Sequence, residues 1–96
     1  MIEIVNLHKE KPCMPYDFKV DRTTLLGNPY VMPDETYRDM VCKLYEQNFR
    51  KIIKPEWIDP LMVVYEEYGK LRLFCWCSPK RCHAETIREY ILKLTR

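Results

Sequence analysis

Glycine is scarce in this chain, and long apolar runs, repeats and blocks of like charge are missing. Only Gly27 and Gly69 can adopt a positive φ angle without steric cost. The lack of an internal repeat or a low-complexity stretch excludes solenoid and linker-like architectures. No apolar run is long enough to cross a bilayer, and the start MIEIVNLHKE has neither a basic segment nor a cleavable apolar core. These absences predict a cytoplasmic protein that does not span a membrane.

Charge is nearly balanced and evenly spread. Sixteen Lys and Arg residues stand against fourteen Asp and Glu residues, which gives a formal net charge of +2. Proteins that bind nucleic acid through its phosphates usually concentrate basic residues on one face or in one run. The sequence therefore gives no indication of nucleic-acid binding.

The chain has the size and composition of a single folded unit. Its 96 residues are 47% hydrophobic and 31% charged, which excludes a disordered tail. We expect one domain over residues 1–96 with one core. Because a short chain buries a smaller share of its surface, homodimerisation is a plausible supplement to its stability.

Cysteine is present in an odd number, without an export signal. The five residues are better interpreted as reduced thiols than as a disulfide framework, and some of them as small apolar packing residues. Cys13 and Cys42 lie far from other reactive residues and look incidental. Cys75, Cys77 and Cys82 lie close together.

The first half of the chain alternates a strand, a long loop and a helix. Residues 1–7 are rich in β-branched residues with apolar side chains on both faces, which favours a central strand. Residues 8–33 are irregular and rich in proline, with room for a short strand at residues 17–20. Residues 34–52 begin with acidic side chains and continue with apolar residues at helical spacing, which predicts one amphipathic helix.

The second half adds a helix, a buried strand and a last helix. Asp59-Pro60 is typical of a helix start and Gly69 of a helix end. Residues 71–77 form an apolar strand, and Ser78-Pro79 repeats the helix-start signal before a final amphipathic helix. This order predicts an α/β fold, with a small and mainly parallel sheet, about three helices packed on it and a right-handed crossover.

The strand-to-helix turn carries the chemically interesting residues. In open α/β sheets, ligands bind beyond the carboxyl ends of the strands, as in Rossmann-like folds. Alternation along the strand points Cys75 and Cys77 to one face and Trp76 to the other, and we expect Cys82 and His83 on the first turn of the helix. Sulfur atoms and an imidazole can then meet in a small volume.

Zinc is one interpretation of this cluster. Cys75, Cys77, Cys82 and His83 supply the four ligands that a tetrahedral site needs. The spacing fits less well, because a C-x-C pair lies along a strand and adjacent residues diverge on a helix. A zinc-binding interaction module stays an alternative.

A reactive thiolate is a second interpretation. Cys82 would lie at a helix N-terminus near Lys80 and Arg81, which should lower its pKa and make it nucleophilic. His83 could serve as base or acid, although sequence neighbours on a helix seldom hydrogen-bond, so the partner could instead come from the loop. This interpretation predicts a cysteine-dependent transferase or hydrolase with Cys82 and His83 as catalytic residues.

A binding pocket without chemistry is the third interpretation. The amides of residues 78–82, including that of Ser78, could hold a phosphate or carboxylate together with Lys80 or Arg81. Trp76 or Tyr30 could then stack on a ring. The plain alternative is that the cysteines pack in the core and the basic residues are solvated.

The loop of residues 22–30 is a second candidate element. Gly27-Asn28-Pro29 requires a tight, specific turn, and the planar guanidinium of Arg22 suits an anion. The alternative is an ordinary turn in which Arg22 pairs with Asp17 or Asp21 on the surface. If the loop folds over the sheet edge, both elements line one pocket.

Together these motifs resemble a domain-of-unknown-function family that is widespread in bacteriophage and bacterial genomes. The resemblance rests on Tyr16-Asp17, on Arg22, on LGNPY at residues 26–30, on a helix with Arg38 and Tyr45, and on CWCSPKRCH at residues 75–83. It implies a small intracellular accessory protein and no settled activity. Tyr30 stands where the family usually has Phe, which keeps an aromatic ring there. The matching residues are Arg22, Gly27, Asn28, Pro29, Cys75, Trp76, Cys77, Pro79, Cys82 and His83.

The leading hypothesis is a phage-type α/β domain that binds, processes or sequesters a nucleotide or nucleoside-derived small molecule. No cofactor is required by this hypothesis. The expected ligand-binding residues are Arg22, Gly27, Asn28, Pro29, Tyr30, Trp76, Ser78, Lys80 and Arg81.

Overall fold

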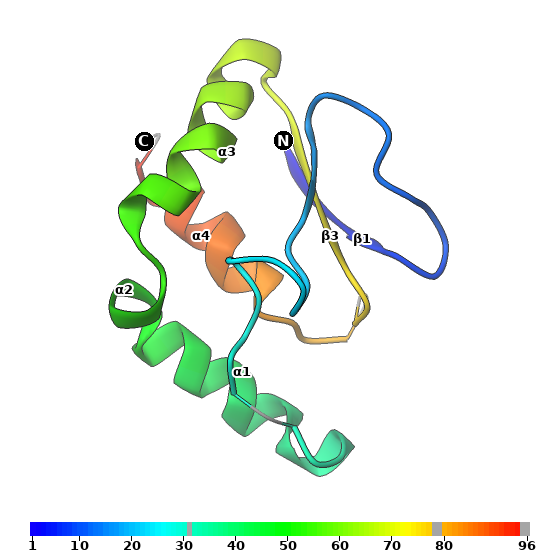
Figure 1. Cartoon of the computed structure of the whole chain (residues 1–96), viewed down its shortest axis with the longest axis vertical. Helices are drawn as coiled ribbons and strands as arrows, with labels where there is room; N and C mark the ends of the chain where they lie inside the picture. Colours follow the sequence, from blue (N-terminus) through cyan, green and yellow to red (C-terminus); the bar gives the residue numbers. More distant parts are fainter. Residues whose placement is uncertain (31, 78–79, 95–96) are drawn as a thin grey trace.

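The computed structural model of the chain describes residues 1–30, 32–77 and 80–94. It has the small α/β architecture that the sequence predicts, with strands and helices arranged as Figure 1 shows. No helix in these ranges is long and apolar enough to cross a membrane. The elements are β1 (Ile2–Asn6), β2 (Asp17–Lys19), the 3₁₀ helix η1 (Glu35–Tyr37), α1 (Arg38–Gln47), α2 (Phe49–Ile52), α3 (Pro55–Tyr68), β3 (Leu71–Cys75) and α4 (Ala84–Leu94).

The sheet has three parallel strands in the order β1-β3-β2. β3 is the central strand, with Leu71 opposite Ile2 of β1 and Arg72 opposite Asp17 of β2. The expectation that residues 1–7 form the central strand was therefore wrong. The physical reason is burial: Leu71 and Leu73 of β3 are inaccessible to solvent, whereas four of the five β1 residues keep some exposure, as an edge strand does.

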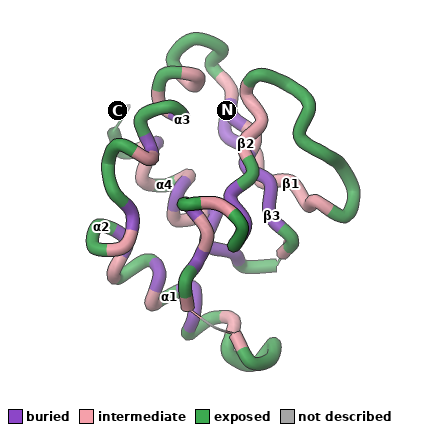
Figure 2. Tube along the Cα trace, viewed as in Figure 1, coloured by how far each residue is buried: buried purple, intermediate pink, exposed green. Residues whose placement is uncertain are grey.

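The two faces of the sheet are covered differently. On one face, Leu71 and Leu73 belong to a core cluster with Ile87 and Ile91 of α4. Figure 1 shows α3 and α4 side by side against this face, and Figure 2 shows that the buried residues follow β3 and the inner side of α4. On the other face, Arg72 lies over the ring of buried Phe74, with 5.1 Å between the guanidinium carbon and the ring centroid.

The helical predictions needed two corrections. The single helix expected over residues 34–52 is divided into η1, α1 and α2. The break between α1 and α2 lies at Asn48, which leaves helical geometry and whose side-chain amide donates to the carbonyl of Leu44 at 3.0 Å. The next helix begins at Pro55 rather than at Asp59-Pro60, so Pro60 lies inside α3. At the observed start, Lys54 is in an extended conformation and Pro55 occupies the first position of the helix. The predicted end of this helix at Gly69 is confirmed. Gly69 has φ of 66°, and its N–H donates to the carbonyl of Tyr65 at 2.8 Å.

The turn between β3 and α4 is longer than the sequence indicated. β3 ends at Cys75 and α4 begins at Ala84, so Cys82 and His83 precede the helix instead of lying on its first turn. The side chain of Glu85 reaches back and accepts the backbone N–H of Cys82 at 3.1 Å, which is one half of a capping box. The helix-start signal at Ser78-Pro79 lies outside the described residues.

Candidate functional site

A pocket of about 180 Å³ lies beyond the carboxyl ends of β2 and β3, between these strands, α1 and the turn before α4. We call it the strand-end pocket. Its place confirms the expected geometry, because the loops that follow parallel strands meet at one edge of the sheet. It also unites the two sequence motifs. Of the predicted site residues, those that line it are Arg22, Asn28, Cys75, Trp76, Cys77, Arg81, Cys82 and His83.

Several other predicted binding residues do not line this pocket. Tyr30 packs against the hydrophobic core, Lys80 points to Glu35 with 3.6 Å between Nζ and Oε1, and Pro29 is exposed elsewhere. Gly27 is needed for the close packing of the turn, because a Cβ there would lie 2.3 Å from the carbonyl oxygen of Asp21. These residues shape or flank the loop, and the predicted role of Ser78 lies outside the described residues.

The loop of residues 21–30 is held by two polar side chains. Asn28 is buried, donates from Nδ2 to the carbonyl of Val41 at 3.3 Å and accepts the N–H of Tyr30 at 2.9 Å. Arg22 donates from Nη1 to the carbonyl of Asn28 at 2.5 Å. Arg22 therefore does not pair with Asp17 or Asp21, as the alternative interpretation proposed, and within the described chain it has no carboxylate partner.

Asp21 is a site residue that sequence reasoning missed. Its buried Oδ2 accepts the indole N–H of Trp76 at 2.8 Å, and its Oδ1 accepts both the N–H and the hydroxyl of Thr23. Burial opposes its ionisation, but the hydrogen bonds from Thr23 and Trp76 and the charge of Lys19 together hold its pKa below the usual value. In the sequence, an Asp beside an Arg indicates only a surface pair.

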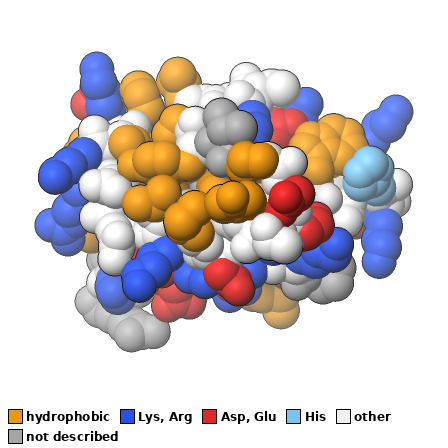
Figure 3. All heavy atoms as spheres, turned by 90° about the horizontal axis from the view of Figure 1, so that it is seen from below, with side chains coloured by type: hydrophobic (Ala, Val, Ile, Leu, Met, Phe, Trp, Pro, Cys, Tyr) orange, Lys and Arg blue, Asp and Glu red, His pale blue; other side chains and the backbone are white. Residues whose placement is uncertain are grey.

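Trp76 has an unusual combination of exposure and restraint. Trp76 is 47% exposed, yet its indole N–H donates to the carboxylate of Asp21. The ring of His8 also packs edge-on against the indole, with 4.7 Å between the ring centroids. Figure 3 shows the molecule from below, with hydrophobic side chains gathered in the middle of the face and charged side chains around them. The indole is thus available to a ligand in a fixed orientation.

His83 is a buried imidazole with a defined tautomer. Nε2 faces the carbonyl oxygen of Val20 and must donate to it, because a carbonyl can only accept. Nδ1 therefore carries the lone pair, and it lies 3.4 Å from Sγ of Cys82. The expectation that these sequence neighbours would not meet was wrong, because both precede α4. Burial lowers the pKa of His83 below its usual value, which keeps the ring neutral.

The ionised thiol is not the one that the sequence indicated. The neighbouring thiols of Cys75 and Cys77, together with burial, raise the pKa of Cys82 above its usual value. A hydrogen bond from Cys82 lowers the pKa of Cys77 to about 5, with further help from the guanidinium of Arg38 and against the effect of burial. The prediction of Cys82 as thiolate was wrong because Cys82 is 3% exposed and lies among other sulfurs, whereas Cys77 faces a cation.

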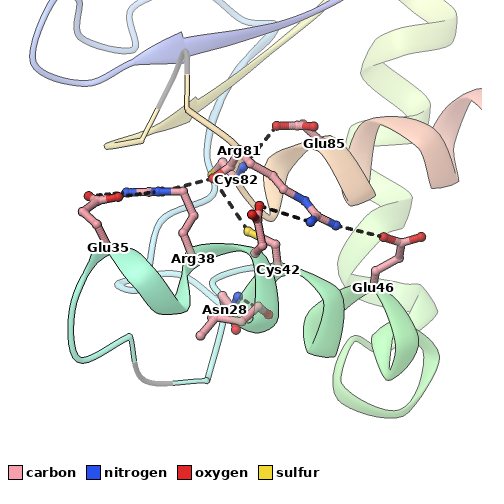
Figure 4. A network of polar contacts seen from close by, with 10 residues as sticks. Asn28, Glu35, Arg38, Cys42, Glu46, Arg81, Cys82 and Glu85 are labelled. Atoms are coloured by element: carbon pink, nitrogen blue, oxygen red, sulfur yellow. Dashed lines mark hydrogen bonds and ion pairs between the residues drawn. The ribbon is translucent and has the colours of Figure 1, made fainter.

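Helix α1 supplies residues that the sequence did not assign to the site. Figure 4 shows Arg38 between Glu35 and the carbonyl of Arg81, with N–O distances of 2.7 to 3.0 Å. Cys42 lines the pocket, and its thiol donates to the same carbonyl at 3.7 Å, so it is not incidental. These contacts join α1 to the turn before α4, although helical periodicity marks α1 only as amphipathic.

Arg81 is anchored by carboxylates. Its guanidinium lies 3.3 Å from Asp39 and 3.7 Å from Glu46, both on α1 (Figure 4). Arg38 is similarly paired with Glu35. In the part of the chain that the structure describes, Arg22 is therefore the pocket's guanidinium without a carboxylate partner.

The predicted cradle of backbone amides is not available where it is described. The N–H of Lys80 donates to the carbonyl of Cys77 at 2.8 Å, and that of Cys82 donates to Glu85. These two donors are used within the chain and are not available to an anion.

The zinc interpretation fails on geometry. Across residues 1–30, 32–77 and 80–94, no group of three or more His, Cys, Asp and Glu side chains is arranged to hold a metal ion. Cys75 is in the hydrophobic core cluster, and Nε2 of His83 faces the Val20 carbonyl. The four residues lie near one another without presenting a tetrahedral set of free donors.

Comparison with known proteins agrees with the family resemblance. The chain is 30% identical over 94 residues to the "Uncharacterized 12.4 kDa protein in nrdA-td intergenic region" of Enterobacteria phage T4, which covers 98% of this chain and 81% of the phage protein. No solved structure matches. A family model, described as "Domain of unknown function (DUF4326)", matches residues 5–93. The phage protein is a relative of this chain, and this protein belongs to the DUF4326 family.

Proposed function

We propose that the strand-end pocket binds a nucleotide or nucleoside-derived small molecule, with Arg22 on its anionic group and Trp76 against its ring. The observation that carries this proposal is the pairing of an uncompensated guanidinium with a restrained, exposed indole at the carboxyl ends of parallel strands. A planar cation and a planar aromatic surface match the two parts of a nucleotide.

The size of the pocket limits how the ligand is held. Its volume of about 180 Å³ is below the roughly 300–1,000 Å³ typical of sites that enclose drug-sized ligands. We therefore expect one ring to enter the pocket, while the charged group stays outside beside the exposed side chain of Arg22. With its phage relative and reduced thiols, the protein fits an accessory role in the cytoplasm.

A thermal-shift panel of nucleosides and of mono-, di- and cyclic nucleotides tests this proposal. A compound at about 100 times its Kd should add about 2.7 kcal/mol to the free energy of unfolding. Arg22→Gln should weaken binding of nucleotides much more than binding of the matching nucleoside. Arg50→Gln, which changes an exposed arginine of α2 outside the strand-end pocket, is the control. If no compound in the panel stabilises the wild-type protein, the proposal is wrong.

A second candidate function is cysteine-dependent transfer or hydrolysis on the same ligand. The observation in its favour is the thiolate character of Cys77, which lines the pocket beside Arg38. A ligand that occupies the pocket should then protect Cys77 from iodoacetamide while Cys13, which is exposed outside the pocket, stays reactive. Equal protection of both thiols, or of neither, would argue against this function.

A further inference from the structure

Four of the five cysteines line the strand-end pocket, and Cys82 interacts with two of the others, Cys75 and Cys77. Cys77 is partly accessible, whereas Cys42, Cys75 and Cys82 are buried. Cys75 is the last residue of β3 and packs in the core. The thiol of Cys82 donates a hydrogen bond to the sulfur of Cys77, so these two sulfurs are direct neighbours.

Each member of this pair has a charged or basic partner of its own. Arg38 of α1 faces Cys77 and stabilises its negative charge. His83 faces Cys82 through Nδ1 at 3.4 Å, and its Nε2–H is held by the carbonyl of Val20. The site thus places a cation at the accessible sulfur and a base at the buried sulfur.

We propose that Cys77 and Cys82 are a redox-active dithiol that reduces low-molecular-weight disulfides by thiol–disulfide exchange, with Cys77 as the attacking and Cys82 as the resolving sulfur. This activity goes beyond the proposed ligand binding and does not depend on it. An accessible thiolate attacks first because the thiolate is the nucleophile in such reactions. A buried neighbouring thiol then completes the reaction because only an internal sulfur can reach the mixed disulfide quickly.

The proposed reaction balances in two steps. The thiolate of Cys77 bonds to one sulfur of the disulfide RSSR, its S–S bond breaks, and RS⁻ leaves and takes a proton from water. Cys82 then transfers its proton to Nδ1 of His83 while its sulfur attacks that of Cys77, and the second RS⁻ leaves and takes the proton from His83. The protein dithiol is oxidised by two electrons to a disulfide, and RSSR is reduced to two RSH molecules.

The experiment treats the fully reduced chain with bis(2-hydroxyethyl) disulfide at about pH 6.5, where an ordinary cysteine is almost entirely protonated. Acid-quenched samples are analysed by intact mass and peptide mapping. Wild type should form a disulfide between Cys77 and Cys82 and release two thiols per chain. Cys82→Ser should stop at a stable mixed disulfide on Cys77, and Cys77→Ser should slow the first step at least about tenfold.

Two further variants distinguish a role in the exchange reaction from a role in the structure alone. Cys13→Ser removes the exposed thiol outside the pocket and should react like wild type. His83→Gln should form the mixed disulfide at the wild-type rate and resolve it more slowly, which a merely structural role would not produce. The proposal is overturned if wild type accumulates only mixed disulfides, if Cys13 reacts before Cys77, or if mapping finds a different disulfide. Mapping the wild-type product keeps the test decisive even if a variant does not fold.

Discussion

Gly27→Ala tests how strictly the loop of residues 21–28 is built. A Cβ at this position would lie 2.3 Å from the carbonyl oxygen of Asp21, 2.6 Å from Cα of Arg22 and 2.8 Å from the carbonyl carbon of Asp21. All three atoms belong to the backbone, so no flexible side chain can move aside. We therefore expect the turn to open.

The expected cost follows from the contacts that this opening breaks. Overpacking of a tight site costs about 1–3 kcal/mol. The opened turn also loses the hydrogen bonds from the N–H of Gly27 to Thr24 (3.1 Å) and from Arg22 to the Asn28 carbonyl (2.5 Å). Each such bond contributes about 0.5–1.5 kcal/mol. Gly27→Ala should therefore lower the free energy of unfolding by about 2–6 kcal/mol and displace Arg22 from the pocket.

Gly69→Ala is the matched control, because its cost has a different origin. Gly69 has φ of 66°, and a Cβ added there would meet no atom of the described residues within 4 Å. Alanine at this position therefore meets only the left-handed backbone penalty of about 1–2 kcal/mol. Urea unfolding of both variants measures the difference, and a ligand found by thermal shift should bind the Gly69 variant normally. The reasoning is refuted if Gly27→Ala is no less stable than Gly69→Ala.

Three other predictions concern the core, the second face of the sheet and the pocket. Tyr45→Phe should lower the free energy of unfolding in urea by about 1–2 kcal/mol, since the inaccessible hydroxyl donates to the buried carbonyl of Leu26 at 2.9 Å; an unchanged value would contradict this. Arg72→Met should lower the free energy of unfolding by about 2–4 kcal/mol in the same assay. The reason is that the fully buried carboxylate of Asp17 loses the cation whose Nε lies 3.6 Å from its Oδ1. An unchanged free energy of unfolding would show that the ion pair contributes nothing. Alkylation of Cys77 by iodoacetamide should increase as the pH rises through about 5, since its pKa is lowered and the thiolate is the reactive form; a midpoint near the ordinary thiol value would contradict the assignment.

The position of the site could be predicted from the sequence because it follows from topology. Parallel strands bring their carboxyl ends to one edge, so the loop with Arg22 and the turn with Cys77 had to meet if both strands belonged to one sheet. Residues 71–77 and the short strand near Asp17 carried enough apolar and β-branched character to be recognised. The α/β class followed from the order of the elements.

The identity of the ionised thiol could not be predicted in the same way. It depends on the hydrogen bond from Cys82 and on the guanidinium of Arg38, and both reach Cys77 through tertiary packing that has no local signal. The start of α3 was missed because Lys54-Pro55 and Asp59-Pro60 both look like helix starts, and only the packed helix distinguishes them. The edge position of β1 was missed because its apolar residues resemble those of a buried strand.

The indole N–H signals of the two tryptophans in a ¹H–¹⁵N spectrum test the central claim most directly. Trp76 lines the strand-end pocket, whereas Trp57 lies on α3 near Lys54 and outside it. Titration with a nucleotide that stabilises the protein should shift the Trp76 signal to saturation and leave the Trp57 signal in place. A stabilising nucleotide that leaves the Trp76 signal unchanged would contradict the account, because binding would then occur elsewhere.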